Sequence, residues 1–314
     1  MTEPRILARR LGLAAAAGLV LIAATACAAG HARPAAARLA EASPAAGTYV
    51  ALGDSYTAAP LTVNELGSPA GCLRSDKSYP ALVAAALHPA AFTDVSCYGA
   101  HTSDMLAAQR TLTGRNQPQL SALSRRDSLV TIQIGGNDVG FGEVLAACAT
   151  LSLTDPWGAP CRAHYTSGGT DRLDRAITAL RPRIAALLAG ARHRAPRARV
   201  LLLGYPDLLP ARGTGCWPEV PLAAGDVAYL RGEEVRLNDM LAAQAARAGD
   251  TFVNTYAASV GHDACQPGGV KWVEGLVPSS VALPFHPNTA GERAMAREVL
   301  AALRVKCRPT FCAD

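Results

Sequence analysis

The chain has 314 residues, half of them hydrophobic, which is enough to bury a full core in one large domain or two small ones. Its formal net charge of +5 is small, and its arginines are scattered or lie along helical stretches. Because they form no basic stripe interleaved with aromatic residues, the composition excludes a nucleic-acid-binding protein.

The first 26 residues have the three parts of an export signal. Arg5, Arg9 and Arg10 precede the apolar run LGLAAAAGLVLIA, which is short for a membrane span, and the residues ATA at 24–26 match an A-x-A cleavage site. We therefore expect residues 1–26 to direct export. The adjacent Arg9 and Arg10 also permit a twin-arginine route.

Cys27 directly follows the cleavage position, where bacterial lipoproteins carry an acylated cysteine. Ala24, however, is not the leucine expected at the start of a lipoprotein box. Two fates therefore stay open, anchoring to a membrane through Cys27 or secretion of the free protein. Residues 27–47 are rich in Ala and Pro and are predicted to be a linker to a single domain over residues 48–314.

The eight other cysteines predict disulfides, since an even number in an exported protein favours pairing. None of them forms a C-x-x-C pair, so we expect no metal site. Eight cysteines allow about 105 pairings, and bridges between sequence neighbours are the simplest set. That set is Cys72–Cys97, Cys148–Cys161, Cys216–Cys265 and Cys307–Cys312.

From Thr48 onward, short apolar runs alternate with helical patterns. The predicted strands are Tyr49–Leu52, Phe92–Cys97, Leu129–Ile134, Arg199–Leu203 and Thr251–Asn254. The predicted helices are Tyr79–Leu87, Asp171–Ala189, Gly225–Ala248 and Pro287–Leu303. Continuous apolar strands separated by helices are typical of a parallel sheet covered on both faces. We therefore predict a doubly wound, three-layer α/β domain of flavodoxin-like type, with its site at the C-terminal ends of the strands. Residues 141–170 are interpreted as an insertion near that site.

Ser55 lies in TYVALGDSYTA (48–58), just past the first predicted strand and at the start of a helix. There the helix dipole favours developing negative charge, so Ser55 is either a nucleophile or a plain N-cap. Gly99 follows the second strand and can present its backbone N–H. Asn137, in IGGNDVGF (134–141), follows the third strand and can direct its carboxamide at an oxyanion. Both are equally compatible with simple turns.

His286, in PFHPNTAGERAMA (284–296), precedes the last predicted helix and is the best candidate for a general base near neutral pH. Three other histidines lie in predicted loops and stay open as residues that face a substrate. They are His101, His164 and His262.

In their order along residues 48–303, these motifs resemble the sequence blocks of the SGNH, or GDSL, hydrolase family. Together with the spaced cysteines and GHDAC (261–265), they look most like the exported lipases and esterases of actinomycetes. The resemblance implies that Ser55 is the nucleophile and His286 the base. It also implies an oxyanion hole made by the N–H groups of Ser55 and Gly99 and the side chain of Asn137. No G-x-S-x-G motif is present, so the α/β-hydrolase fold is not expected.

Many members of this family carry an aspartate three residues before the histidine, and here that position is Leu283. As in some actinomycete relatives, we expect a main-chain carbonyl to orient the imidazole, and we assign this role to Leu283. Asp207 or Asp263 is the alternative partner.

The resemblance implies an exported serine ester hydrolase that cleaves lipids or other apolar acyl esters through an acyl-enzyme, as a monomer and without a cofactor. A phospholipase A or a carbohydrate deacetylase would use the same residues. The alternative outside the enzymes is a surface-anchored binding protein that kept the fold without turnover.

Overall fold

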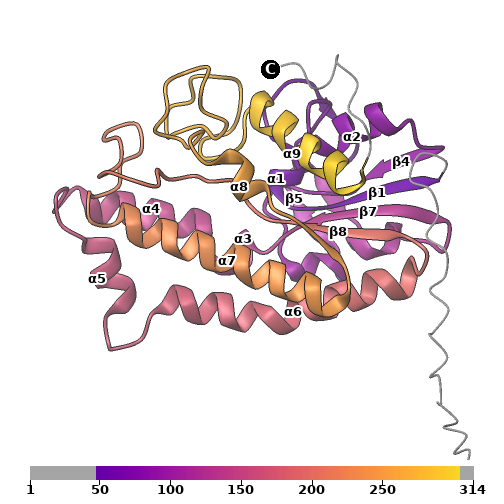
Figure 1. Ribbon diagram of the computed structural model, residues 1–314, viewed down its shortest axis with the longest axis horizontal. Helices are drawn as coiled ribbons and strands as arrows, with labels where there is room; N and C mark the ends of the chain where they lie inside the picture. The colour runs from indigo at the N-terminus through magenta and orange to yellow at the C-terminus, as the bar shows by residue number, and fades with distance from the viewer. Residues whose placement is uncertain (1–46, 305–314) are drawn as a thin grey trace, which may run out of the picture. The chain divides into compact units, whose positions relative to one another are not determined.

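The computed structural model describes residues 47–304, whose centre is a five-stranded parallel sheet (Figure 1). All neighbouring strands in the sheet run parallel. In spatial order the strands are β4 (Ala91–Asp94), β1 (Thr48–Gly53), β7 (Asp127–Gln133), β8 (Arg199–Leu203) and β9 (Thr251–Val253). The five predicted strands are therefore all present, with ends that differ by a few residues.

Alternate residues of the strands point into two different cores, as the pleat of a strand requires. On one face, Val50 and Leu52 pack with Ile184 of α6 (Arg172–Arg194) and Leu241 of α7 (Val227–Ala248). On the other face, Ala51 belongs to a cluster formed with α2 (Tyr79–Leu87) and α9 (Thr289–Ala302). Figure 1 shows these two pairs of helices on opposite sides of the sheet, which confirms the predicted three layers.

The segment predicted as an insertion consists mainly of helices. It contains α4 (Phe141–Ser152) and α5 (Pro160–Thr166), which follow the short helix α3 (Gly136–Val139). A third apolar cluster joins both helices to the loops that precede α7 and α9. The insertion therefore packs against these loops, and it builds one wall beside the C-terminal ends of the strands.

The remaining elements are short and lie mostly in the connections. The helices are α1 (Ser55–Ala58) and α8 (Thr255–Ser259), and the 3-10 turns are η1 (Ala70–Cys72), η2 (Thr102–Met105) and η3 (Gln119–Ala122). Two small antiparallel ribbons pair β2 (Glu65–Leu66) with β3 (Arg74–Ser75) and β5 (Gln109–Thr111) with β6 (Gly114–Asn116). Among residues 47–304, no helix is long and apolar enough to cross a membrane.

Three of the predicted disulfides are present. They are Cys72–Cys97, Cys148–Cys161 and Cys216–Cys265. The predicted Cys307–Cys312 bridge, the export signal, Cys27 and the linker up to residue 46 lie outside the described residues.

Candidate active site

Ser55 is the first residue of α1, directly after the C-terminal end of β1. The side chain of Asp54 caps this helix by accepting a hydrogen bond from the N–H of Tyr56 at 2.9 Å. The residue before the cap must be glycine, because a Cβ on Gly53 would lie 2.6 Å from the carbonyl oxygen of Gln133. This packing fixes the serine at the C-terminal ends of the strands, with only 5 % of its surface exposed.

His286 reaches Ser55 from a segment 231 residues further along the chain. Its Nε2 lies 2.7 Å from the Oγ of Ser55. The segment is held by Asn288, which caps α9 and also donates hydrogen bonds to the carbonyl of Lys271 and the carboxylate of Glu274. The structure therefore brings together the two residues that the sequence could place only at separate strand and helix ends.

The carbonyl that orients His286 belongs to Pro284, so the assignment to Leu283 is wrong by one residue. Nδ1 of His286 lies 2.9 Å from the Pro284 oxygen, whereas the Leu283 oxygen accepts the backbone N–H of His286 at 3.1 Å. The cause is Phe285, whose left-handed backbone (φ 60°) turns the preceding carbonyl toward the ring. Because a carbonyl can only accept, Nδ1 carries the proton and Nε2 is free to accept from the Ser55 hydroxyl.

The two aspartates considered as alternatives are engaged elsewhere. Asp207 is fully buried and lies 3.6 Å from the Nε of Arg231. Asp263 accepts hydrogen bonds from Cys265 and Gln266. Neither of them contacts His286.

Tyr56 has a role that the sequence does not predict. Its hydroxyl donates a 2.6 Å hydrogen bond to the carbonyl of Phe285, and its ring lies 5.0 Å from the imidazole of His286 between centroids. The residue beside the serine therefore supports the backbone immediately before the histidine. Nothing in the sequence indicates this pairing, since the two residues are 229 positions apart.

The expected oxyanion donors, Ser55, Gly99 and Asn137, line the same pocket as His286. Within residues 47–304, the N–H groups of Ser55 and Gly99 have no hydrogen-bond partner. Gly99 has φ 72°, a conformation that glycine adopts without strain. Asn137 donates one amide hydrogen to the carbonyl of Ala100 at 2.9 Å, which leaves its second amide hydrogen for a ligand.

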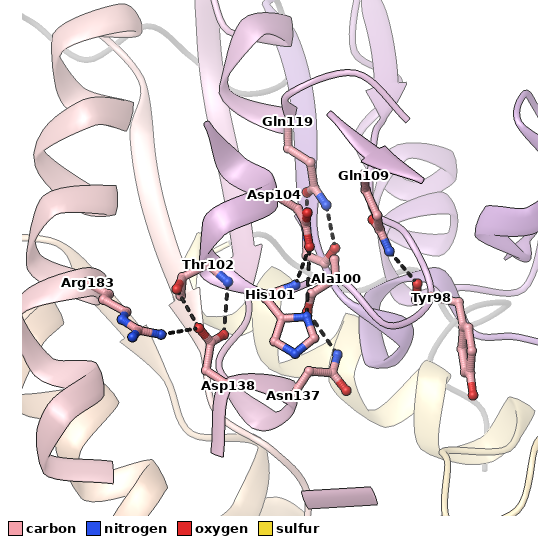
Figure 2. A network of polar contacts seen from close by, with 11 residues as sticks. Tyr98, Ala100, His101, Thr102, Asp104, Gln109, Gln119, Asn137, Asp138 and Arg183 are labelled. Carbon is pink, nitrogen blue, oxygen red and sulfur yellow. Dashed lines mark hydrogen bonds and ion pairs between the residues drawn. The ribbon is translucent and has the colours of Figure 1, made fainter. Parts of the chain in front are cut away.

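Asp138, the neighbour of Asn137, joins its segment to the one that carries Ala100 and Thr102 (Figure 2). Its carboxylate accepts hydrogen bonds from the N–H and the hydroxyl of Thr102, at 2.9 and 2.5 Å. Arg183 of α6 completes the contact with an ion pair at 3.3 Å. These bonds hold the loop after β4 against α3, so they fix the spacing between the oxyanion donors. Asp138 therefore has a structural role beside the proposed oxyanion role of Asn137.

Burial sets the charge of the groups around the nucleophile. It lowers the pKa of His286 to about 4, and the bond to the Pro284 carbonyl opposes this effect only in part. Burial also raises the pKa of Asp54 to about 7, against the hydrogen bonds from Tyr205 and Tyr56. Tyr205 in turn accepts the N–H of Gly136 at 2.8 Å and donates to Asp54 at 2.6 Å. At neutral pH the imidazole is therefore uncharged and able to accept a proton.

The pocket in front of Ser55 has a volume of about 730 Å³ and a mainly apolar wall. The apolar side chains come from α4, from the loops before α7 and α9, and from α7 itself. They include Phe141, Leu145, Ala146, Pro221, Leu237, Leu276 and Leu283. Of the three histidines left open, His101 lines the pocket, whereas His164 packs on Tyr165 and His262 stacks on Trp272. No cluster of metal-binding side chains is found among the described residues.

Comparison with known proteins identifies close similarity over most of the chain. The sequence model of the GDSL-like lipase/acylhydrolase family matches residues 51–294. A Streptomyces coelicolor protein named Lipase 2 is 40% identical over 268 residues, which cover 83% of this chain and 88% of that protein. An esterase from Streptomyces scabiei is 30% identical and covers 80% of this chain and 84% of its own length.

Two solved structures share the fold at similar identity. The phospholipase A1 of Streptomyces albidoflavus NA297 is 32% identical with a TM-score of 0.68, over 82% of this chain and 98% of the other. The extracellular lipase of Streptomyces rimosus is 30% identical with a TM-score of 0.67, over 82% of this chain and all of the other.

Proposed function

We propose that Ser55 and His286 are the catalytic dyad of this chain, which belongs to the GDSL-like lipase/acylhydrolase family. Its activity is that of a lipase or esterase, the hydrolysis of carboxylic esters. The observation that carries the proposal is the 2.7 Å contact between Ser55 Oγ and His286 Nε2 inside an apolar pocket.

In the first half of the proposed reaction, Ser55 Oγ attacks the carbonyl carbon of the ester while its proton passes to Nε2 of His286. The imidazolium that forms keeps its Nδ1–H on the Pro284 carbonyl. The oxyanion accepts hydrogen bonds from the N–H groups of Ser55 and Gly99 and from the Asn137 side chain. Collapse of this intermediate expels the alcohol, which takes the proton from His286, and leaves an ester on Ser55.

In the second half, a water molecule gives a proton to Nε2 of His286 and attacks the acyl carbon. The same three donors hold the second oxyanion, and the proton returns to Ser55 as the acid leaves. Pro284 replaces the carboxylate of a Ser-His-Asp triad, so it fixes the tautomer of His286 but stabilises the imidazolium less than a full negative charge would.

We propose that the substrate is a lipid or another ester with an apolar acyl chain. The support is the pocket volume of about 730 Å³, which is larger than an acetyl group needs, and the aliphatic and aromatic wall formed with α4 and α7. The similarity to a phospholipase A1 makes phospholipids a specific candidate within this class.

We propose that the protein acts as a monomer outside the cytoplasm. All the groups of the proposed mechanism come from one chain, and three disulfides suit an oxidising compartment. The mass of the mature N-terminal peptide from wild type and from Cys27→Ser would distinguish a diacylglycerol-modified protein from a free one.

The direct test of the substrate class is hydrolysis of p-nitrophenyl esters from acetate to palmitate. We expect the highest kcat/KM with medium or long chains. Activity confined to acetate would favour a deacetylase instead. A fluorophosphonate probe that labels wild type but not Ser55→Ala would exclude a binding protein without turnover, and absence of both labelling and hydrolysis would favour one.

A further inference from the structure

Four exposed apolar side chains lie in two segments beside the mouth of the pocket. Leu61 is 45%, Leu276 47%, Val277 76% and Val281 67% exposed. We call these four residues the apolar rim. Leu276 lines the pocket, and so does Leu283, two residues after Val281. The segment between them therefore borders the opening.

The second segment is joined to the first by a backbone hydrogen bond. The N–H of Leu283 donates to the carbonyl of Pro60 at 3.3 Å, which places the neighbour of Leu61 beside a residue that lines the pocket. Leu61 has φ 60°, a left-handed conformation that a leucine rarely adopts. An exposed leucine therefore occupies a backbone position that glycine or asparagine would adopt with less strain. Such strained positions cluster at functional sites.

Neither segment carries an exposed charge. Residues 55–64 and 275–285 contain no Asp, Glu, Lys or Arg. The nearest acid before the second segment is Glu274, which is fully buried and accepts hydrogen bonds from the N–H and the hydroxyl of Ser279. A further bond from the N–H of Leu276 to the carbonyl of Glu219 holds the start of this loop. The rim residues are therefore uncharged and their loop is held by polar contacts, although the exposed Glu219 adjoins Leu276 through its backbone.

Other exposed apolar side chains of the described chain lie in a different setting. Leu106, Leu112 and Trp157 are 69%, 101% and 84% exposed, but each has a charged residue that is not buried two positions away in the sequence. Glu274, two positions before Leu276, is by contrast buried. Single apolar residues among charges are normal on a protein surface, whereas a contiguous uncharged group marks an interaction site. The rim residues form such an uncharged group on the side of the entrance built by residues 275–285, whereas the exposed Glu143 lines another part of the pocket.

We propose that the apolar rim docks this protein on the surface of a lipid aggregate, so that the pocket opens directly onto the lipid phase. This inference rests on the proposed function. A protein partner seated on the rim would cover the mouth and obstruct the substrate, whereas an aggregate that contains the substrate supplies it there. Because the rim side chains carry no charge, docking depends mainly on apolar contact.

The test uses the Ser55→Ala protein, which cannot consume the lipid, and vesicles of phosphatidylcholine as the probe. Co-sedimentation compares it with the same protein carrying Leu61→Ser, Val277→Ser and Val281→Ser. The triple substitution should lower the partition coefficient by about tenfold or more, since each change removes buried apolar area. The matched control is Trp157→Ser, which removes a larger exposed side chain away from the mouth and should leave partitioning unchanged. Equal partitioning of the triple variant and its parent would overturn the proposal.

A second measurement separates this proposal from the proposed function. With Ser55 intact, the triple variant should hydrolyse monomeric p-nitrophenyl butyrate within about twofold of wild type, which also shows that it folds. If wild type hydrolyses this ester but does not bind vesicles, the docking proposal fails alone. If it hydrolyses no ester, the proposed function fails. A wild-type dimer that the triple substitution converts to monomers would instead assign the rim to contact between copies of this chain.

Discussion

The hydroxyl of Tyr56 donates a hydrogen bond to the main-chain carbonyl of Phe285, with 2.6 Å between the two oxygens. Phe285 is the residue whose left-handed backbone directs the Pro284 carbonyl at His286. The side chain next to the proposed nucleophile therefore supports the turn that orients the proposed base. This contact makes the positions of the two catalytic groups depend on each other.

Tyr56→Phe is expected to lower kcat by roughly tenfold with little change in KM, because it removes one buried hydrogen bond that holds the turn. Steady-state kinetics on p-nitrophenyl butyrate would measure it. The matched control is Tyr98→Phe, since the Tyr98 ring lies 6.4 Å from His286 but its hydroxyl bonds to no described residue. An equal effect of both substitutions would contradict a positioning role for Tyr56.

Thr102→Val is expected to lower kcat by about 10–100-fold, because it breaks the 2.5 Å bond to Asp138 and loosens the spacing of the oxyanion donors. Thr102→Ser keeps the hydroxyl and should restore most of the rate. Binding of a phosphonate transition-state analogue should weaken in parallel with kcat, while KM for the ester changes little. A loss of thermal stability with unchanged kcat would mean that this contact serves the fold alone.

The pH dependence should show an acid limb at low pH. Since burial lowers the pKa of His286 to about 4, the fraction of uncharged imidazole falls only as the pH approaches that value. We expect kcat/KM for a neutral ester to be half-maximal near pH 4, and a limb near the ordinary histidine value of about 6.5 would contradict the buried geometry.

Stability should depend on pH with opposite signs for two residues. Between about pH 4 and the ordinary histidine pKa of about 6.5, His286 binds a proton in the unfolded chain but not in the folded one. The contribution of His286 to the free energy of unfolding therefore falls as the pH falls. The pKa of Asp54 is raised to about 7, so the folded chain binds the extra proton and its contribution falls as the pH rises toward 7. Urea unfolding of wild type and Asp54→Asn across this pH range should show that the variant lacks the loss of stability with rising pH that Asp54 causes, and keeps the dependence that His286 causes.

Leu283→Asp places a carboxylate where many relatives of the family have one, but Nδ1 of His286 already has an acceptor in Pro284. We expect the acid limb of kcat/KM to stay in place and KM for medium-chain esters to rise, because the substitution adds a charge to the apolar pocket wall. Leu283→Asn is the matched uncharged control. A limb that moves to higher pH only in the Asp variant would show that the carboxylate has replaced Pro284.

The parallel sheet could be predicted from the sequence because its strands are continuous apolar runs between helices. The order β4-β1-β7-β8-β9 could not, since it depends on how the layers pack. Ser55 and His286 could be identified because their motifs, in their order along the chain, resemble those of the family, and the structure places the two side chains in contact. Three neighbouring disulfides followed from parity and spacing.

The contacts that the sequence did not predict are those set by tertiary structure. Pro284 rather than Leu283 faces the imidazole because Phe285 adopts a left-handed backbone, which no pattern of residue types indicates for a phenylalanine. The bond between Thr102 and Asp138 spans 36 positions, and both residue types are common in loops. Such buried polar contacts become visible only when the elements are assembled.

The most direct test of the catalytic dyad is the rate of ester hydrolysis by wild type, Ser55→Ala and His286→Ala, measured on p-nitrophenyl butyrate in protein with intact disulfides. We expect each substitution to lower kcat by at least about 10³-fold, and the double variant to be no slower than either single one, because the two residues act as a unit. A Ser55→Ala protein that keeps wild-type activity would contradict the account.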